Sequence, residues 1–199
     1  MSVTLVLIAV TVGVSLLAWR DARLMDRLIL WPPAIARRGE YYRLLSYGLV
    51  HADGAHLLFN MVTLYFFGTL IERVLTPYIG TAGFVGFYAG GLLISILPSY
   101  LANRNNPDYR SLGASGAVSA VLFAFILLQP WAMLFVFFIP APAILFGVAY
   151  MAYTIWMDRR GTDNVNHSAH LWGAGYGVVF MLLVEPRVLG LFVERLLNP

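Results

Sequence analysis

The sequence predicts an all-α polytopic membrane protein that forms a single domain over residues 1–199, with six transmembrane helices. Composition is the first observation: 60% of the residues are hydrophobic and only 12% are charged, whereas a soluble domain carries about 25% charged residues. The second is that the apolar residues form long blocks, several of them close to the roughly 20 residues that a helix needs to cross a bilayer. The lipid bilayer is therefore the expected surroundings of the chain.

The apolar blocks place the spans in order along the chain. The first block has no basic region before it and no clear cleavage site, so we expect a retained span rather than a signal peptide. The long apolar stretch 112–157 holds two spans, because prolines at 130, 140 and 142 interrupt it. A short interfacial helix is expected in the tail, 186–199. The six spans are expected near 2–19, 52–72, 79–101, 115–129, 137–157 and 168–184.

The charged residues lie mostly between the spans. The first connection, 20–47, holds six of the thirteen arginines and contains amphipathic pieces, which is typical of a loop lying on the membrane surface. The formal charge of +3 comes from scattered arginines, without lysine, so nucleic acid is not an expected partner. The absence of cysteine excludes disulfides and thiolate chemistry.

Polar side chains gather near the beginning of three predicted spans, where burial in lipid makes them costly and suggests a function. The second, fourth and sixth spans run in the same direction, so their N-terminal ends meet on one side of the membrane. Two further histidines close to span ends are expected to be structural and to bond to backbone. The converging residues are His56, Asn60, Ser115 and His170, and the structural pair is His51 and His167.

This combination indicates nucleophilic chemistry at Ser115. A serine hydroxyl becomes a strong nucleophile when a base, usually histidine, takes its proton. The developing oxyanion needs fixed donors, which the side chains of Asn60 and His56 and the backbone N–H of Ser115 can supply. The predicted fourth span is about 22 Å long, shorter than the roughly 30 Å hydrocarbon core. Ser115 is therefore expected below the membrane surface, at the floor of a cavity.

Glycines accompany each of these elements. Gly113 and Gly116 would let a substrate backbone approach the serine. Gly173 and Gly177 would let the sixth span press against Ala117 and Ala120 of the fourth, as small residues do in membrane helix pairs.

A different class of function remains open from the residues alone. The four histidines could bind zinc or copper in a transporter or channel. The His-Glu-x-x-His motif of zinc proteases is absent. Close helix packing is the ordinary explanation of the small residues around Ser115.

Three motifs together resemble the rhomboid intramembrane serine proteases: the segment 41–72 with its His-x-x-x-Asn motif, Gly-Ala-Ser-Gly at 113–116, and Ala-His-x-x-Gly-x-x-x-Gly at 169–177. The resemblance implies a six-helix core and a catalytic dyad in which Ser115 is the nucleophile and His170 the base. Asn60, His56 and the Ser115 backbone would form the oxyanion hole. It implies a transmembrane protein substrate, no cofactor and no metal. A catalytically silent, substrate-binding relative is the other reading within the family.

Two positions stand out against the family pattern. Arg43 matches an arginine of the family's first loop, which has a structural role. Many relatives carry an aromatic residue four positions after the nucleophile, packed on the histidine ring, where this chain has Ser119. An aromatic residue is expected to be tolerated at that position.

The side of the membrane that Ser115 faces is a point on which two arguments disagree. The resemblance implies a cytoplasmic N-terminus, with the site open to the extracytoplasmic side of a prokaryotic plasma or inner membrane. The connections after the first, third and fifth spans nevertheless hold ten of the thirteen arginines, and arginine-rich loops are usually cytoplasmic. We favour the family orientation, because six of the ten lie in the long first loop, where Asp21, Asp26 and Glu40 are expected partners.

Overall fold

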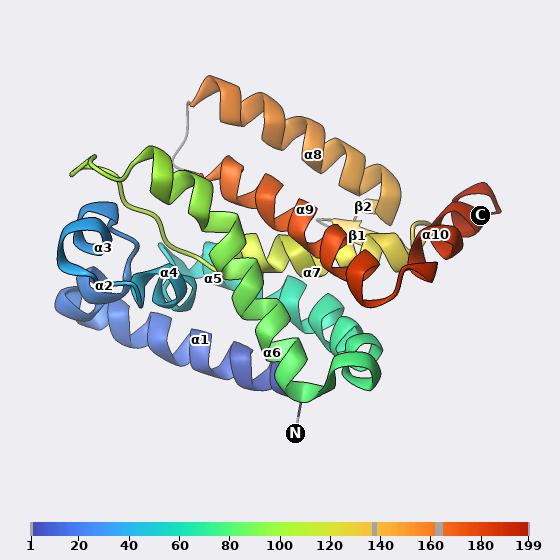
Figure 1. Ribbon diagram of the computed structural model, residues 1–199, viewed down its shortest axis with the longest axis horizontal. Coiled ribbons are helices and arrows are strands. Elements are labelled where there is room, and N and C mark those ends of the chain that lie inside the picture. Colours follow the sequence, from blue (N-terminus) through green and yellow to red (C-terminus); the bar gives the residue numbers. More distant parts are fainter. Residues whose placement is uncertain (1, 137–138, 162–164, 199) are drawn as a thin grey trace.

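The computed structural model describes residues 2–136, 139–161 and 165–198 and is mostly helical (Figure 1). The first half of the chain begins with α1 (Val3–Arg20), followed in the long connection by α2 (Ala22–Leu28), α3 (Pro32–Arg38), α4 (Arg43–Ser46) and the 3₁₀ turn η1 (Tyr47–Leu49). It continues through α5 (Gly54–Thr63), the π-helical segment η2 (Leu64–Gly68) and α6 (Thr69–Ala102). The second half consists of α7 (Ser115–Leu128), the strands β1 (Met133–Val136) and β2 (Ile139–Pro142), α8 (Ala143–Arg160), α9 (His167–Val184) and α10 (Arg187–Leu197).

By length and hydropathy, three continuous helical segments of the described residues are able to cross a membrane: Val3–Arg20, Gly54–Ala102 and His167–Val184. The second is interrupted at Gly80, whose φ of 68° and ψ of 175° are not helical, and the chain changes direction there (Figure 1). It therefore contains both the second and the third predicted spans. The structure is a bundle of apolar helices, whereas the count of six membrane crossings stays a prediction.

The fifth predicted span, 137–157, is shifted in the structure. Residues 137–138 lie outside the described part, and the helix begins only at Ala143 and extends to Arg160. The residues before it form an antiparallel hairpin in which Met133 pairs with Pro142 and Leu134 with Ala141. The prediction was wrong here because an apolar run of this length satisfies both a strand and the start of a helix.

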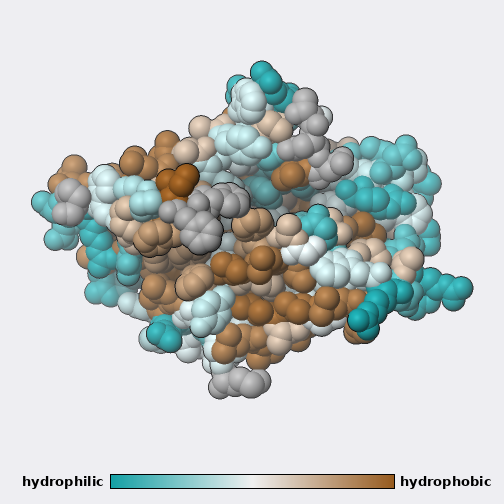
Figure 2. Space-filling view, turned by 180° about the vertical axis from the view of Figure 1, so that it is seen from behind, coloured by the Kyte–Doolittle hydropathy of each residue, from teal (hydrophilic) through white to brown (hydrophobic). Residues whose placement is uncertain are grey.

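Helix α7 occupies the centre of the bundle. Eleven of its 14 residues are buried, as expected for a helix that is apolar on every side. It packs against α6 and α9, which also pack against each other, while α8 lies at the outer edge (Figure 1). Brown, hydrophobic residues cover the middle of the rear face and teal, hydrophilic ones gather toward its two ends, which is the pattern of a protein that faces lipid (Figure 2).

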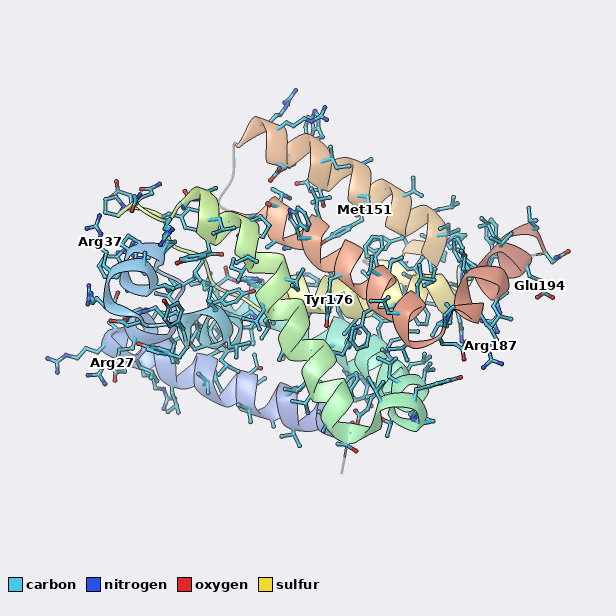
Figure 3. The ribbon with its side chains drawn as sticks, in the orientation of Figure 1. Arg27, Arg37, Met151, Tyr176, Arg187 and Glu194 are labelled. Atoms are coloured by element: carbon cyan, nitrogen blue, oxygen red, sulfur yellow. The ribbon has the colours of Figure 1, made fainter. Side chains whose placement is uncertain are left out.

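The charged ends of the bundle are distinct. Arg27 and Arg37 of the first connection lie at one end, and Arg187 and Glu194 of α10 lie at the other (Figure 3). The tail thus forms the helix expected within 186–199.

The start of α1 is joined to α6 by a half-buried contact. The Glu72 carboxylate accepts hydrogen bonds from the backbone N–H groups of Val3 (2.7 Å) and Thr4 (2.9 Å) and from the Ser2 hydroxyl (2.6 Å). A carboxylate at a helix N-terminus accepts from N–H groups that have no partner within the helix, and its negative charge interacts favourably with the helix dipole.

Candidate active site

The segment before Ser115 is fixed by the first connection. Leu30 and Ser111 form an isolated antiparallel bridge, with N···O distances of 2.9 and 3.2 Å. Two residues later the Gly113 N–H donates to the Tyr47 carbonyl at 2.9 Å. The first connection and the segment entering α7 are therefore one hydrogen-bonded unit.

An aromatic stack holds the same two segments together. The Trp31 ring lies between the guanidinium groups of Arg38, 4.8 Å from its centroid, and Arg110, 4.5 Å away. Its indole N–H donates to the Pro107 carbonyl at 3.1 Å. Such cation–π contacts strengthen the attachment of the segment before Ser115 to the first connection.

Gly113 has a backbone conformation that favours glycine. Its φ is 108°, and a Cβ atom there would lie 2.5 Å from Cε1 of His56. Both the positive φ and the imidazole require a residue without a side chain. Gly113 thereby lets the chain enter α7 directly beneath His56.

Ser115 and His170 are brought together from two helices. Ser115 is the first residue of α7 and His170 lies in the first turn of α9, and Oγ of the serine is 2.7 Å from Nε2 of the histidine. Both side chains are half-buried. At this distance a proton can pass from the hydroxyl to the imidazole.

The two helices touch through backbone. A Cβ atom on Gly173 would lie 2.1 Å from the carbonyl oxygen of Gly116, and one on Gly177 would lie 2.1 Å from that of Ala120. Gly177 thus contacts Ala120 as expected, whereas Gly173 contacts Gly116 and Ala117 packs against Gly91 of α6. The rotation of α7 about its axis decides this, and composition does not reveal it.

His56 and Asn60 lie on α5, one helical turn apart. Asp53 caps the helix by accepting from the His56 N–H at 2.8 Å, and the Asn60 amide donates to the His56 carbonyl at 2.9 Å. Both side chains line one cavity of about 1220 Å³ together with Ser115 and His170. The four converging residues thus share one cavity.

His51 is buried behind this cavity and bonds to the backbone next to Ser115. Its Nε2 accepts from the Ala114 N–H at 3.3 Å, so the ring proton is on Nδ1, 3.1 Å from the Ser15 hydroxyl. That hydroxyl donates in turn to the Leu49 carbonyl at 3.0 Å. Burial, with the neighbouring His56 second, lowers the pKa of His51 to about 4. The expected structural bond to backbone is confirmed for this histidine.

Asn166, which the sequence reasoning missed, is the N-cap residue directly before α9. Its side-chain oxygen accepts from the Ala169 N–H and from the Ser99 hydroxyl, both at 3.0 Å, and its amide donates to the Tyr109 hydroxyl at 3.0 Å. Asparagine is a strong N-cap residue, so its position four residues before His170 was a usable signal. The network fixes the turn from which His170 projects.

Ser119 lies one helical turn after Ser115 and faces Tyr150 of α8. The two hydroxyl oxygens are 3.2 Å apart, and the tyrosine ring stacks on His170 with centroids 6.1 Å apart and an interplanar angle of 21°. Tyr150 therefore fills the room that an aromatic residue at 119 would need. An aromatic residue at 119 is therefore not expected to be tolerated while Tyr150 is present.

His167 is buried, with its ring edge-on to Tyr153 of α8 at 5.8 Å. Its partner in sequence, His170, has its ring centroid 5.9 Å away. The histidines thus form two pairs, His51 with His56 and His167 with His170. Within the described residues no group of three or more side chains of the kinds that ligate metals is found.

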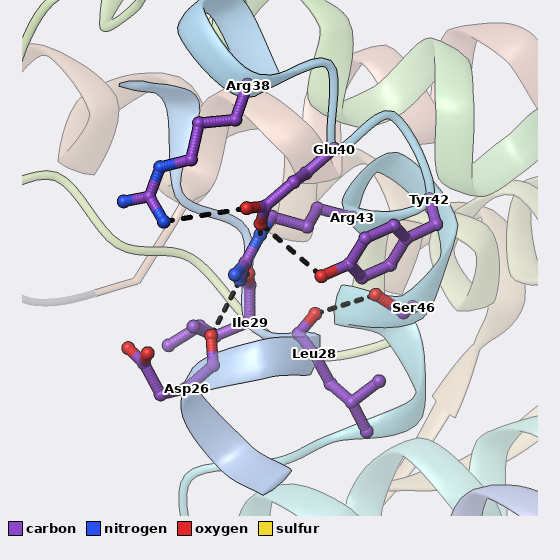
Figure 4. Close-up of polar contacts among 8 residues, drawn as sticks. All are labelled: Asp26, Leu28, Ile29, Arg38, Glu40, Tyr42, Arg43 and Ser46. Atoms are coloured by element: carbon purple, nitrogen blue, oxygen red, sulfur yellow. Dashed lines mark hydrogen bonds and ion pairs between the residues drawn. The ribbon is translucent and has the colours of Figure 1, made fainter. Parts of the chain in front are cut away.

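Arg43 supports the first connection from inside (Figure 4). Its side chain is 4% exposed, and it donates to the carbonyls of Asp26 (2.6 Å) and Ile29 (2.7 Å) and to the Glu40 carboxylate (2.6 Å). This bond lowers the pKa of Glu40, which also lies 3.6 Å from Arg38. Glu40 is an ionic partner as expected, while Asp26 contributes its carbonyl and Asp21 accepts from the Arg23 N–H to begin α2.

Comparisons with known proteins match the part of the chain that contains these residues. A family model described as Rhomboid domain matches residues 38–187. The mitochondrial RHOMBOID-like protein 12 of Arabidopsis thaliana is 34% identical over 155 residues, which are 72% of this chain and 46% of the plant protein. The mitochondrial Rhomboid protein 1 of Saccharomyces cerevisiae is 33% identical over 146 residues, 69% of this chain and 40% of the yeast protein.

A bacterial relative is also found. YdcA of Bacillus subtilis, provisionally designated a rhomboid protease, is 27% identical over 162 residues, 78% of this chain and 76% of the bacterial protein. The chain thus spans about half the length of the plant relative and three quarters of the bacterial one. The apolar helices indicate an integral membrane protein. The prediction of a prokaryotic plasma or inner membrane is not borne out, because the plant and yeast relatives are mitochondrial.

Proposed function

Because the chain belongs to the rhomboid family, we propose that it is a serine endopeptidase that cleaves transmembrane segments of membrane proteins through a dyad of Ser115 and His170. One observation carries the proposal: the 2.7 Å contact between Oγ of Ser115 and Nε2 of His170 at the wall of a large cavity in a mostly apolar bundle. A polar pair of this kind inside a membrane protein is costly to retain without a function.

The reaction follows from the positions of these groups. The Ser115 oxygen attacks the scissile carbonyl carbon while His170 takes the hydroxyl proton, and His170 then gives that proton to the leaving amine. An ester between Ser115 and the N-terminal product forms, and water entering through the cavity hydrolyses it with His170 again acting as base. No cofactor takes part.

The oxyanion formed in each step needs donors on one side of the cavity. The Ser115 backbone N–H is without an intrahelical partner because it begins α7, and the helix dipole adds positive potential there. The side chains of Asn60 and His56 face the same cavity. We assign the three donors to the oxyanion hole.

The substrate is a transmembrane protein that presents a small residue at the cleaved bond. Gly113 and Gly116 line the cavity, but a Cβ atom on Gly113 would meet the His56 ring and one on Gly116 would meet the Ser95 side chain. These glycines therefore make room for His56 and Ser95, and the small residue at the cleaved bond follows from the family resemblance alone. Cleavage needs an extended substrate strand, because an intact helix keeps its peptide groups bonded to one another. Substrates whose helices unwind easily are therefore expected to be cleaved fastest.

Labelling with a fluorophosphonate probe tests the proposal against its alternatives. We expect the purified protein to label, and Ser115→Ala and His170→Ala to abolish both labelling and cleavage of a model transmembrane substrate in proteoliposomes. Ser168→Ala is the matched control, because this serine also lines the cavity and the variant should keep full labelling.

Each alternative predicts a different result. Labelling and turnover that persist in Ser115→Ala would contradict the serine mechanism. A folded wild-type protein that neither labels nor cleaves would be a silent substrate-binding relative. Loss of activity on adding a chelator would instead support a metal site at the histidines.

A further inference from the structure

His170 has a ring that is held at one edge by Ser115. The hydrogen bond to Ser115 fixes the position of Nε2, and a packing contact on the face of the imidazole fixes the plane of the ring. The residue on α7 that is placed to restrain it is Ser119, one turn beyond the nucleophile, and a serine is too short to pack on the ring face. An aromatic ring that packs on the face of His170 therefore has to come from another helix.

Tyr150 of α8 supplies an aromatic face at this point. Its ring stacks on His170 with centroids 6.1 Å apart at 21°, within the range of separations at which aromatic rings attract each other. The tyrosine ring is itself placed by two phenylalanines, Phe146 at 5.9 Å and Phe123 at 6.1 Å. The Tyr150 ring is therefore held in place by side chains of both α7 and α8.

The hydroxyl of Tyr150 completes the arrangement. It lies 3.2 Å from the Ser119 hydroxyl, which is buried on α7. Ser115 and Ser119 are four residues apart, so they lie on the same face of α7. The contacts therefore close a circuit through three helices: Ser115 to His170, His170 to Tyr150, and Tyr150 to Ser119.

The size of residue 119 explains why this circuit exists. A serine there leaves room for a ring from α8, and its hydroxyl gives that ring a hydrogen-bonding partner. An aromatic side chain at 119 would occupy the same space. The two arrangements are alternatives, one with the ring on α7 and the other with the ring on α8.

We propose that Tyr150 is the positioning residue that orients the His170 ring toward Ser115, so that the seating of α8 against α7 and α9 sets the reactivity of the dyad. The inference rests on the proposed function for its kinetic consequence, while the orientation of the ring itself can be measured without activity. Because α8 lies at the edge of the bundle (Figure 1), a displacement of this helix would remove the restraint on the base.

Steady-state cleavage of a model transmembrane substrate in proteoliposomes is the first test. Tyr150→Leu should lower kcat by about 10- to 100-fold, as misplacement of a catalytic group does, with little change in KM. Tyr150→Phe keeps the ring and loses only the bond to Ser119, so its kcat should fall by about 2- to 10-fold. Tyr153→Leu is the matched control, since this tyrosine of the same helix contacts His167 instead, and its kcat should stay near that of the wild type.

An exchange of the two side chains tests the position directly. In the wild-type background Ser119→Tyr should lower kcat, because Tyr150 already fills the space. Tyr150→Ala should lower it as well. The double variant Ser119→Tyr with Tyr150→Ala moves the ring to α7 and should recover most of the activity that either single variant loses. A double variant no better than the worse single variant would contradict the proposal.

Nuclear magnetic resonance of protein with isotope-labelled histidines, in detergent micelles, measures the surroundings of the His170 ring independently of activity. The His170 ring signals are identified by their loss in His170→Gln. Tyr150→Leu removes the ring current above His170 and should shift those signals, whereas Tyr153→Leu should leave them in place. Equal spectra and equal kcat values for Tyr150→Leu and Tyr153→Leu would overturn the inference. If the wild-type protein proved inactive, the proposed function would fail, and these spectra would still decide whether Tyr150 holds the ring.

Discussion

The buried His51 makes a specific prediction about acid stability. Its Nε2 accepts the Ala114 N–H, so a second proton on the ring would place an N–H group against another N–H group next to Ser115. The neutral ring is the form that fits, and burial accordingly lowers its pKa to about 4 from an ordinary value of 6.5. The perturbation is acidification, compared between the wild type and His51→Gln, whose amide oxygen can accept the same N–H and does not titrate.

The magnitude follows from the difference between the two pKa values. The folded value is the lower one, so the unfolded chain takes up the proton first, and the stabilisation is fully present above pH 6.5. It is lost as the pH falls from 6.5 to about 4. The difference of about 2.5 units, at 1.36 kcal/mol per unit, corresponds to about 3 kcal/mol of unfolding free energy.

Thermal unfolding in detergent, followed by tryptophan fluorescence, measures this loss. At about 2–4 °C per kcal/mol for a chain of this size, the wild type should lose about 6–12 °C more than His51→Gln between pH 7.5 and pH 4. Acid-sensitive groups remote from His51, such as Glu40, are common to both proteins and cancel in the comparison. His56 interacts with His51, so both proteins are compared again in a His56→Gln background. Equal losses in the two proteins would show that the neutral form of His51 does not contribute to stability.

Three further outcomes are expected. Asn60→Ala should lower kcat by about 10- to 1000-fold, the range for loss of one oxyanion donor, and an unchanged kcat would remove Asn60 from the oxyanion hole. Glu72→Gln should destabilise the protein by about 1–2 kcal/mol, because a neutral amide replaces the carboxylate at the start of α1; an unaltered thermal midpoint would argue against this contribution. In intact bacterial cells that express the chain in their inner membrane, a membrane-impermeant maleimide should label Asn105→Cys and not Glu194→Cys, which lies on α10 (Figure 3). The reverse pattern would mean that the site opens to the cytoplasm of the host.

Much of the helical framework could be predicted because it depends on local composition. The first, fourth and sixth spans begin and end within a residue or two of Val3–Arg20, Ser115–Leu128 and His167–Val184. The paired strands Met133–Val136 and Ile139–Pro142 were missed, because the same apolar residues also suit the start of a helix. The π-helical segment Leu64–Gly68 likewise has no mark in the sequence.

The site shows the same division. Motif spacing was enough to bring Ser115 and His170 together, since both begin spans that run in one direction. The role of Tyr150 could not be predicted, although Ser119 signalled that something else must support the histidine. Helix α8 offers several aromatic residues, and only its rotation against α7 and α9 selects which of them faces His170.

The glycine contacts between α7 and α9 act as a spacer for the dyad. A Cβ atom at Gly173 would lie 2.1 Å from the Gly116 carbonyl oxygen, where about 3.4 Å is ordinary contact, so alanine would push the helices apart by the difference, about 1.3 Å. Ser115 and His170, the proposed nucleophile and base, lie on those same two helices with Oγ and Nε2 2.7 Å apart, and a further separation of about 1 Å would break their hydrogen bond. The distance between Ser115 and His170 therefore depends on how closely α7 and α9 approach each other. Glycine rather than alanine at position 173, outside the proposed dyad, is a condition for that distance.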